Sequence, residues 1–230
     1  MPPEKSNRAL LDAAQGPLHP VARDTLIAAL DVGWADPRRL YREGRRAAML
    51  LNQAREVLAG GLGMRPDEVS LHPTGTHALL AGLAGLRRAR HRVGEQIHTS
   101  AVDQAAVLRR LPAAARVPVD SLGCLDTERW ARAVNAPGVA LGVLAAANHE
   151  VGTCQPLREA ADACAAAGVP LLVDLAASWG RAGAVPSQGQ AYAADAASFA
   201  GPPLGVLGVR TGTRFDPAYP RSAPEHGLSL

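Results

Sequence analysis

The sequence has 230 residues, 47% of them hydrophobic and 20% charged, a balance typical of a globular protein and not of a disordered one. The formal net charge of +3, from 24 basic and 21 acidic side chains, argues against a protein that binds nucleic acid mainly through excess positive charge. No stretch approaches the roughly 20 apolar residues of a membrane span, and no apolar signal core follows the N-terminus.

Helical and strand-like segments alternate along the chain. Apolar residues at helical spacing mark the helices. Four residues indicate where helices begin or end: Pro20 lies in a first turn, Asp126 is an N-cap, Gly60-Gly61 is a stop, and Gly168 follows a last turn. They predict helices over residues 20–30, 38–59, 76–86, 102–111, 126–133 and 157–167. Short apolar runs predict strands over residues 68–71, 96–99, 116–119, 139–145, 170–174, 194–199 and 205–209.

This alternation predicts an α/β fold with a mostly parallel sheet flanked by helices. The uninterrupted apolar runs at 139–145 and 170–174 are typical of strands covered on both faces. Residues from Thr211 onward are rich in Pro, Gly and Ser and are expected to form a loose tail. Ligands of such folds bind beyond the carboxyl ends of the strands, so the residues there are the candidates for a site.

Three strand ends carry polar residues, and each has two interpretations. The turn at His72–His77 begins a helix and either holds an anion on its backbone amides or is a plain capping turn. Asp174 either pairs with a cationic ring nitrogen or caps the next helix. Asn148, His149 and Glu150 form either a polar site or a turn.

The content of reactive residues limits the chemistry. Lys5 is the sole lysine, since the other 23 basic residues are arginines, so no buried amine is available from the middle of the chain. The three cysteines, Cys124, Cys154 and Cys164, form no C-x-x-C pair and suggest a reducing compartment, from which we expect a cytoplasmic protein. The seven histidines show no metal-ligand motif, and no Gly-x-Ser-x-Gly elbow of a serine hydrolase occurs.

Taken in order, several segments resemble the class V aminotransferase family of pyridoxal-phosphate enzymes, and within it the cysteine desulfurases. Each segment is weak alone, but the ordered series from about Leu10 to Arg214 is fairly specific. The matching segments are residues 10–14, 17–20, 33–37, 67–69, 74–79, 148–156, 173–174, 178–180, 195–199 and 205–213.

The resemblance implies the large-domain fold of the fold type I pyridoxal-phosphate enzymes. It implies that the cofactor phosphate would lie on the turn at Gly75 and Thr76. It also implies that Asp174 would pair with the pyridine nitrogen and favour the protonated ring, which then acts as an electron sink.

Departures from the family pattern are as informative as the matches. The cofactor lysine of the family lies in a Ser-x-x-His-Lys turn, whereas here Ser198 is followed by residues 199–205 without a lysine. The turn is either substituted at Pro202-Pro203 or, as we prefer, shortened by a deletion of several residues. Gln104 stands in the place of the ring-stacking histidine, and His149 in the place of the asparagine near the phenolic oxygen of the cofactor. No cysteine falls at the position of the family's sulfur acceptor. Because the sequence ends soon after the last predicted strand, we expect the small C-terminal domain of the family to be missing.

These features predict a shortened, catalytically inactive cysteine desulfurase-like protein. The expected boundaries are an N-terminal segment at 1–12, a large domain at 13–210 and a tail at 211–230. The candidate cofactor-binding residues are Gly75, Thr76, Gln104, His149 and Asp174, with pyridoxal 5′-phosphate bound only non-covalently if at all, no catalytic residue and no metal. The alternatives are an interaction or regulatory module that pairs with itself or with an intact desulfurase, as the homodimers of the family imply, and a truncated gene product.

Overall fold

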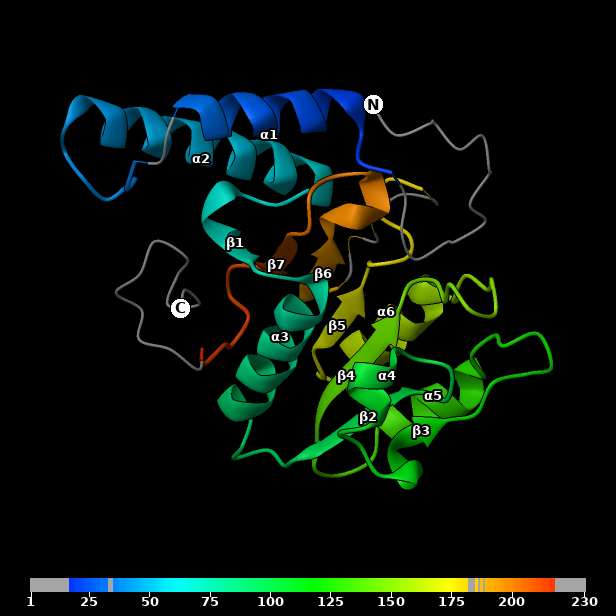
Figure 1. The fold of residues 1–230 in the computed structure, drawn as a ribbon. Coiled ribbons are helices and arrows are strands. Elements are labelled where there is room, and N and C mark those ends of the chain that lie inside the picture. Colours follow the sequence, from blue (N-terminus) through cyan, green and yellow to red (C-terminus); the bar gives the residue numbers. More distant parts are fainter. Residues whose placement is uncertain (1–16, 33–34, 182–184, 186, 188, 218–230) are drawn as a thin grey trace, which may run out of the picture.

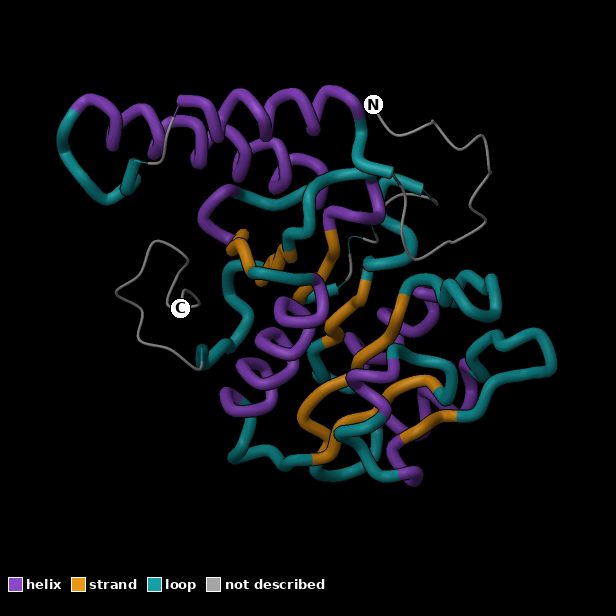
Figure 2. Tube along the Cα trace, in the orientation of Figure 1, coloured by secondary structure: helices purple, strands orange, loops and turns teal. Residues whose placement is uncertain are grey.

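The computed structural model describes residues 17–32, 35–181, 185, 187 and 189–217. The N-terminal segment predicted at 1–12 and most of the predicted tail therefore lie outside the described residues. Seven strands form one sheet in the order β1-β7-β6-β5-β4-β2-β3 (Figures 1 and 2). The strands are β1 (Val69–His72), β2 (Gln96–Ser100), β3 (Arg116–Val117), β4 (Val139–Ala145), β5 (Leu171–Asp174), β6 (Ala191–Asp195) and β7 (Gly205–Val209).

Five of the strands form the parallel part of the sheet. β3, β2, β4, β5 and β6 are parallel to their neighbours, and β7 lies antiparallel between β6 and β1. The predicted α/β class and the mostly parallel sheet are thus confirmed. Because β1 runs in the same direction as the parallel strands, its carboxyl end shares one edge of the sheet with those of β2, β4, β5 and β6.

Helices cover both faces of the sheet (Figure 1). The helices are α1 (Pro20–Val32), α2 (Arg42–Leu62), α3 (Gly75–Ala89), α4 (Ala105–Leu108), α5 (Thr127–Val134) and α6 (Leu157–Ala166). Short 3₁₀ turns are η1 (Pro66–Glu68) before β1, η2 (Ala113–Ala115) before β3 and η3 (Ala196–Phe199) after β6. Since alternate residues of a strand point to opposite faces, Leu141 and Val143 of β4 pack with α3, and Leu144 packs with α5 and α6.

Close packing explains one glycine in the central strand. Trp130 of α5 is fully buried and donates its indole N–H to the Ala160 carbonyl of α6 at 3.0 Å. A Cβ at Gly142 would lie 3.0 Å from the Trp130 ring and 3.1 Å from the Cys164 sulfur. A glycine at this position therefore lets α5 and α6 approach β4.

Several boundaries differ from the predictions for tertiary reasons. α2 continues through the predicted stop at Gly60-Gly61 and ends at Gly63, which has φ +63° and donates its amide to the Ala59 and Gly60 carbonyls. The predicted strand at 194–199 is instead the end of β6 followed by η3, and the predicted helix at 102–111 is reduced to α4. Asp126 caps α5 as predicted, accepting from the Arg129 amide at 2.9 Å.

The first residues of the predicted tail contact the body of the protein. A Cβ at Gly85 of α3 would lie 2.3 Å from the Phe215 ring, and the Asp216 amide donates to the Gly85 carbonyl at 3.1 Å. Arg88 also pairs with Asp216 at 3.1 Å. Phe215 and Asp216 are therefore held against α3.

Candidate functional site

The turn between β1 and α3 makes close contacts at Gly75 and Gly205 that leave no room for a Cβ. Thr74 caps α3 by accepting from the His77 amide at 3.1 Å, and the Gly75 amide donates to Asp195 Oδ2 at 2.9 Å. A Cβ at Gly75 would lie 2.6 Å from the Asp195 Cβ, and one at Gly205 would lie 2.0 Å from the Thr74 carbonyl oxygen. The turn is thus a capping turn, tied to the ends of β6 and β7, and it leaves the Thr76 side chain exposed at the first turn of α3.

Asp174 lies buried at the carboxyl end of β5, with 5% of its surface exposed. Its Oδ1 accepts from the Ala176 amide at 2.9 Å, and residues 176–181 are turns, so Asp174 does not cap a helix. Burial, with the neighbouring carboxylates of Asp103 and Asp195, raises the pKa of Asp174 to about 7. A cation beside this carboxyl would favour its ionised form.

Asp103 holds the loop after β2 against β4. Its Oδ1 accepts from the Gln104 amide at 2.7 Å and its Oδ2 from the Ala145 amide at 2.9 Å, and burial raises its pKa. These bonds place Gln104 at the same edge of the sheet as Asp174. The Gln104 Oε1 atom is buried and has no hydrogen-bond partner among the described residues, so this acceptor is available to a donor on a ligand.

His149 lies in the turn that follows β4. Asn148 organises the turn, because its Oδ1 accepts from the Glu150 and Val151 amides at 2.7 and 3.0 Å, and its side-chain amide donates to the Val102 carbonyl. The His149 side chain is 40% exposed and its Nε2 lies 4.0 Å from Glu150 Oε1. The segment is therefore a turn organised by Asn148, and it also places the polar side chain of His149 at the edge of the sheet where the parallel strands end.

A pair of histidines, His72 buried and His77 half-buried, lies at the first turn of α3. His72 Nδ1 lies 3.1 Å from His77 Nδ1, and His72 Nε2 lies 3.1 Å from the Ser70 hydroxyl. Burial, followed by the proximity of His77, lowers the pKa of His72 to about 4. Neither this pair nor the roles of Asp103 and Asp195 were predicted. The available signal was their position, since His72, His77, Asp103 and Asp195 all lie at or just after strand ends.

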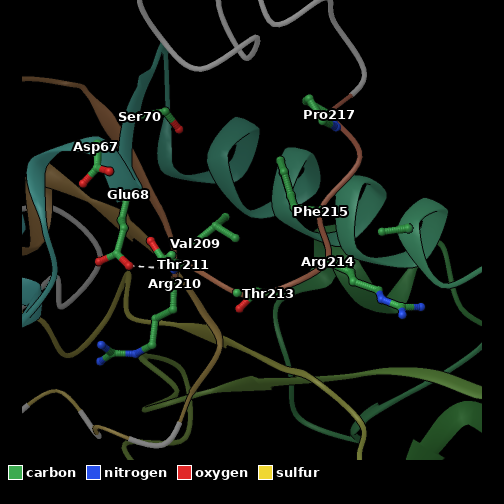
Figure 3. Close-up of a pocket in the computed structure, with 12 residues that line it drawn as sticks. Asp67, Glu68, Ser70, Val209, Arg210, Thr211, Thr213, Arg214, Phe215 and Pro217 are labelled. Atoms are coloured by element: carbon green, nitrogen blue, oxygen red, sulfur yellow. Dashed lines mark hydrogen bonds between the residues drawn. The ribbon is translucent and has the colours of Figure 1, made fainter.

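A pocket of about 660 Å³ lies at the other edge of the sheet, where β1 begins and β7 ends (Figure 3). Glu68, Ser70, Arg210, Thr211 and Phe215 are among its lining residues, and Glu68 Oε1 accepts from the Thr211 amide at 2.6 Å. The pocket is thus separate from the candidate cofactor residues, which lie at the carboxyl ends of β1, β2, β4 and β5.

Within the described part of the chain, neither the cysteines nor possible metal ligands form a second candidate site. Cys164 is buried, which raises the pKa of its thiol to about 12, whereas Cys154 is exposed and Cys124 half-buried. The described residues hold no cluster of three or more His, Cys, Asp or Glu side chains suited to a metal ion. None of the described helices is both long and apolar enough to cross a membrane.

Cysteine desulfurases are among the curated proteins to which the chain is similar. A 31% identical cysteine desulfurase of Cereibacter sphaeroides aligns with 87% of this chain and 54% of its own length, and a 31% identical IscS-like cysteine desulfurase of Mycobacterium tuberculosis with 72% and 45%. A NifS/IcsS protein homolog of Lactobacillus delbrueckii subsp. bulgaricus is 28% identical over 64% of the chain and 40% of its own length. The chain thus spans about half the length of these curated relatives.

Solved structures share the fold. A NifS-like protein superposes with a TM-score of 0.86 at 23% identity, covering 94% of this chain and 63% of the other. The structure described as SspA in complex with cysteine superposes with a TM-score of 0.83 at 21% identity, covering 96% and 67%. The model of the aminotransferase class-V family matches residues 13–213, nearly the whole chain, and the protein therefore belongs to that family.

Proposed function

We propose that this chain binds pyridoxal 5′-phosphate without a covalent bond and does not catalyse cysteine desulfuration by itself. The observation that carries the proposal is the absence of any lysine other than Lys5. A lysine imine would position the aldehyde, and the same amine would act as general base, a role worth roughly 10²–10⁴-fold in rate by itself. Without that amine, binding is left to the phosphate and ring contacts.

The ring end of the proposed site fits the cofactor. Asp174 is a buried acid whose pKa of about 7 would fall beside a pyridinium nitrogen, so the pair would be mutually stabilising. Gln104 offers a buried amide oxygen without a partner among the described residues. When bound, the cofactor supplies an electron sink, and the role of Asp174 is to keep the ring nitrogen protonated.

The phosphate end is supported by the turn at Thr74–His77. Its hydroxyls and backbone stand at the amino end of α3, a helix of 15 residues, where the helix dipole favours an anion. Gly75 is held against Asp195, so Thr76 is the residue of this turn that we assign to the phosphate. His149, exposed at the same edge, is assigned to the phenolic side of the ring.

A short loop between η3 and β7 occupies the position where the family's lysine is expected. Ala200 follows η3 with φ +59°, Gly201 donates its amide to the Ala196 carbonyl, and Ala196 donates to the Leu204 carbonyl, both at 2.8 Å. Pro202 and Pro203 lie within this loop. The loop returns the chain directly to β7, which supports a shortened cofactor turn.

The test is spectroscopic and uses the whole chain. Added pyridoxal phosphate should bind in equilibrium dialysis, be removed completely by gel filtration, and leave no borohydride-trapped adduct between residues 10 and 209 in peptide maps. Asp174→Asn should weaken cofactor binding in equilibrium dialysis about tenfold or more, as expected for loss of one charge-assisted contact. A trapped adduct in that range, or sulfide released from cysteine at an enzymatic rate, would falsify the proposal.

A second function, pairing with another chain, is favoured by the exposed apolar side chains of α1 and α2. Figure 1 shows both helices on one side of the molecule, remote from β3. Leu30 and Val57 are 53% and 75% exposed, and Val21, Ile27, Met49 and Leu50 are also exposed. Exposed apolar side chains on two helices support an interaction surface there, and the family resemblance favours a second copy or an intact desulfurase as the partner.

Sedimentation velocity distinguishes a monomer from a dimer. We expect a dimer that Leu50→Glu and Val57→Glu dissociate, whereas Leu122→Glu, at an exposed apolar residue outside these helices, should leave the mass unchanged. A monomer that also fails to co-purify with a desulfurase would exclude pairing. The cytoplasmic location remains a prediction from the cysteine content.

A further inference from the structure

The segment that follows β7 forms one wall of the pocket in Figure 3 and packs on α3. The Asp216 amide donates to the Gly85 carbonyl at 3.1 Å, and the Asp216 carboxylate pairs with Arg88 at 3.1 Å. A Cβ at Gly85 would lie 2.3 Å from the Phe215 ring, so the ring rests directly on the helix. These contacts hold Arg214, the residue before Phe215, at the pocket, which it lines.

Two arginines lie near each other at this end of the pocket. Arg214 and Ala89 both line it, and Arg90 follows Ala89 as the C-cap of α3. Burial lowers the pKa of Arg90, and the nearby charge of Arg214 lowers it further. Arg90 Nε is also buried without a hydrogen-bond partner among the described residues. The desolvation of this guanidinium is therefore only partly compensated by the protein.

The other arginines around the end of α3 and the pocket have their charges paired. The ion pairs are Arg65–Asp67 at 2.8 Å, Arg87–Glu95 at 3.0 Å and Arg88–Asp216 at 3.1 Å. Within the part of the chain that the structure describes, neither Arg90 nor Arg214 has such a pair. The positive charge that remains is thus concentrated at these two residues, and an anion placed beside them would relieve their mutual repulsion.

The rest of the pocket limits the size and polarity of a ligand. A volume of about 660 Å³ suits a small organic molecule. Phe215 and Val209 are half-buried and supply apolar surface, and Thr213 adds a hydroxyl. Figure 3 shows Glu68 and Arg214 at opposite sides of the pocket, so an anionic group beside Arg214 stays away from the Glu68 carboxylate.

We propose that this pocket binds a small organic oxoanion, with its carboxylate or phosphate beside Arg214 and Arg90 and its apolar body against Phe215 and Val209. Guanidinium groups bind either oxoanion through charge-assisted hydrogen bonds, so the two head groups share one recognition chemistry. The inference does not depend on the proposed cofactor binding, because the candidate cofactor residues lie at the opposite edge of the sheet.

Calorimetric titration at pH 7.5 with phenyl phosphate, phenylacetate and phenylacetamide tests the requirement for charge. Phenylacetamide has the apolar body of phenylacetate without its charge, so it should bind at least about tenfold more weakly. The two anions show whether phosphate or carboxylate is preferred. Added sodium chloride should weaken the binding of both anions.

Substitutions of single arginines test the location of the charge. Arg214→Gln and Arg90→Gln should each weaken binding of the anions about tenfold and leave phenylacetamide unchanged. Arg109→Gln is the matched control, since Arg109 is exposed at the end of α4 and does not line the pocket, and it should bind like the natural chain. Arg214 is exposed, so its variant should also keep the melting temperature of the natural chain.

Amide spectra of the nitrogen-15-labelled chain locate the bound probe. We expect shifts at Gly212, Thr213 and Phe215, and none at Gly75 and Thr76 of the proposed cofactor turn. Shifts confined to that turn, anion binding that Arg214→Gln does not weaken, or equal affinity for phenylacetate and phenylacetamide would each overturn this inference and leave the cofactor proposal intact. A lack of binding by all three probes at millimolar concentration would overturn it as well.

Discussion

The Gly75 amide of α3 donates to Asp195 Oδ2 at the end of β6, across 2.9 Å and 120 residues of sequence. This bond joins the start of the helix to the parallel part of the sheet. Asp195 also accepts from the Ala197 amide through its other oxygen, at 3.0 Å, so one carboxylate organises both the helix start and η3. The candidate phosphate turn is thereby positioned by the strand that leads to the shortened loop.

Gly75→Ala should destabilise the protein by about 1–3 kcal/mol, because the new Cβ would lie 2.6 Å from the Asp195 Cβ and force the two elements apart. Gly60→Ala is the matched control, since it adds a Cβ to α2 with nothing within 4 Å and should stabilise by about 0.5–1 kcal/mol. Urea unfolding of the two variants measures both effects. Equal effects in the two variants would contradict the close contact.

Asp174 should make stability decrease as pH rises. Its pKa is raised from 3.8 to about 7 in the folded protein, so its contribution is fully present below pH 3.8 and is lost as pH rises through 7. Asp174→Asn keeps an oxygen for the Ala176 amide but does not titrate, so at pH 8 it should be more stable than the natural chain by on the order of 2–4 kcal/mol. Unfolding free energies at pH 5 and 8 decide this; a pH-independent difference between the proteins would refute it.

His72 should have the opposite effect in an overlapping range. Its pKa is lowered from 6.5 to about 4, so its contribution is present above pH 6.5 and is lost as pH falls toward 4. In His72→Asn this acid-dependent loss should disappear, whatever the variant's stability at pH 7. Thermal melts between pH 4 and 7 test the slope, and an unchanged slope would mean that His72 is not held neutral by burial.

The effect of Gly85→Ala on the free energy of unfolding should change sign when Phe215 is replaced by alanine. In the natural chain Gly85→Ala should destabilise, because its Cβ would meet the Phe215 ring at 2.3 Å. After Phe215→Ala, which alone should cost about 1–3 kcal/mol, the same change should stabilise by about 0.5–1 kcal/mol. A double-mutant cycle in urea measures the coupling. Additive effects would show that Phe215 does not pack on Gly85 of α3 in solution.

Local pattern was sufficient for the elements whose signals are self-contained. β4 and β7 occupy the predicted residues, because a run such as 139–145 is apolar throughout and suits a strand covered on both faces. Asp126 was predictable because a cap bonds to an amide three residues away. The ends of elements that depend on distant contacts could not be predicted from local pattern. α2 passes Gly60-Gly61 where Trp179 packs beside Gly61, and α4 is short where Asp103 ties its start to Ala145.

The amino-acid sequence alone determined the alternation of helices and strands, the family pattern and the scarcity of lysine, because each is a property of composition or local order that folding cannot alter. Only the tertiary structure decided which side chains meet. The carboxylates of Asp103 and Asp195 come near Asp174, and His72 meets His77 beside Ser70, because the strand order of the sheet brings their ends to one edge. The shifted pKa values of Asp103, Asp174 and His72 follow from their burial at that edge, which no local pattern encodes.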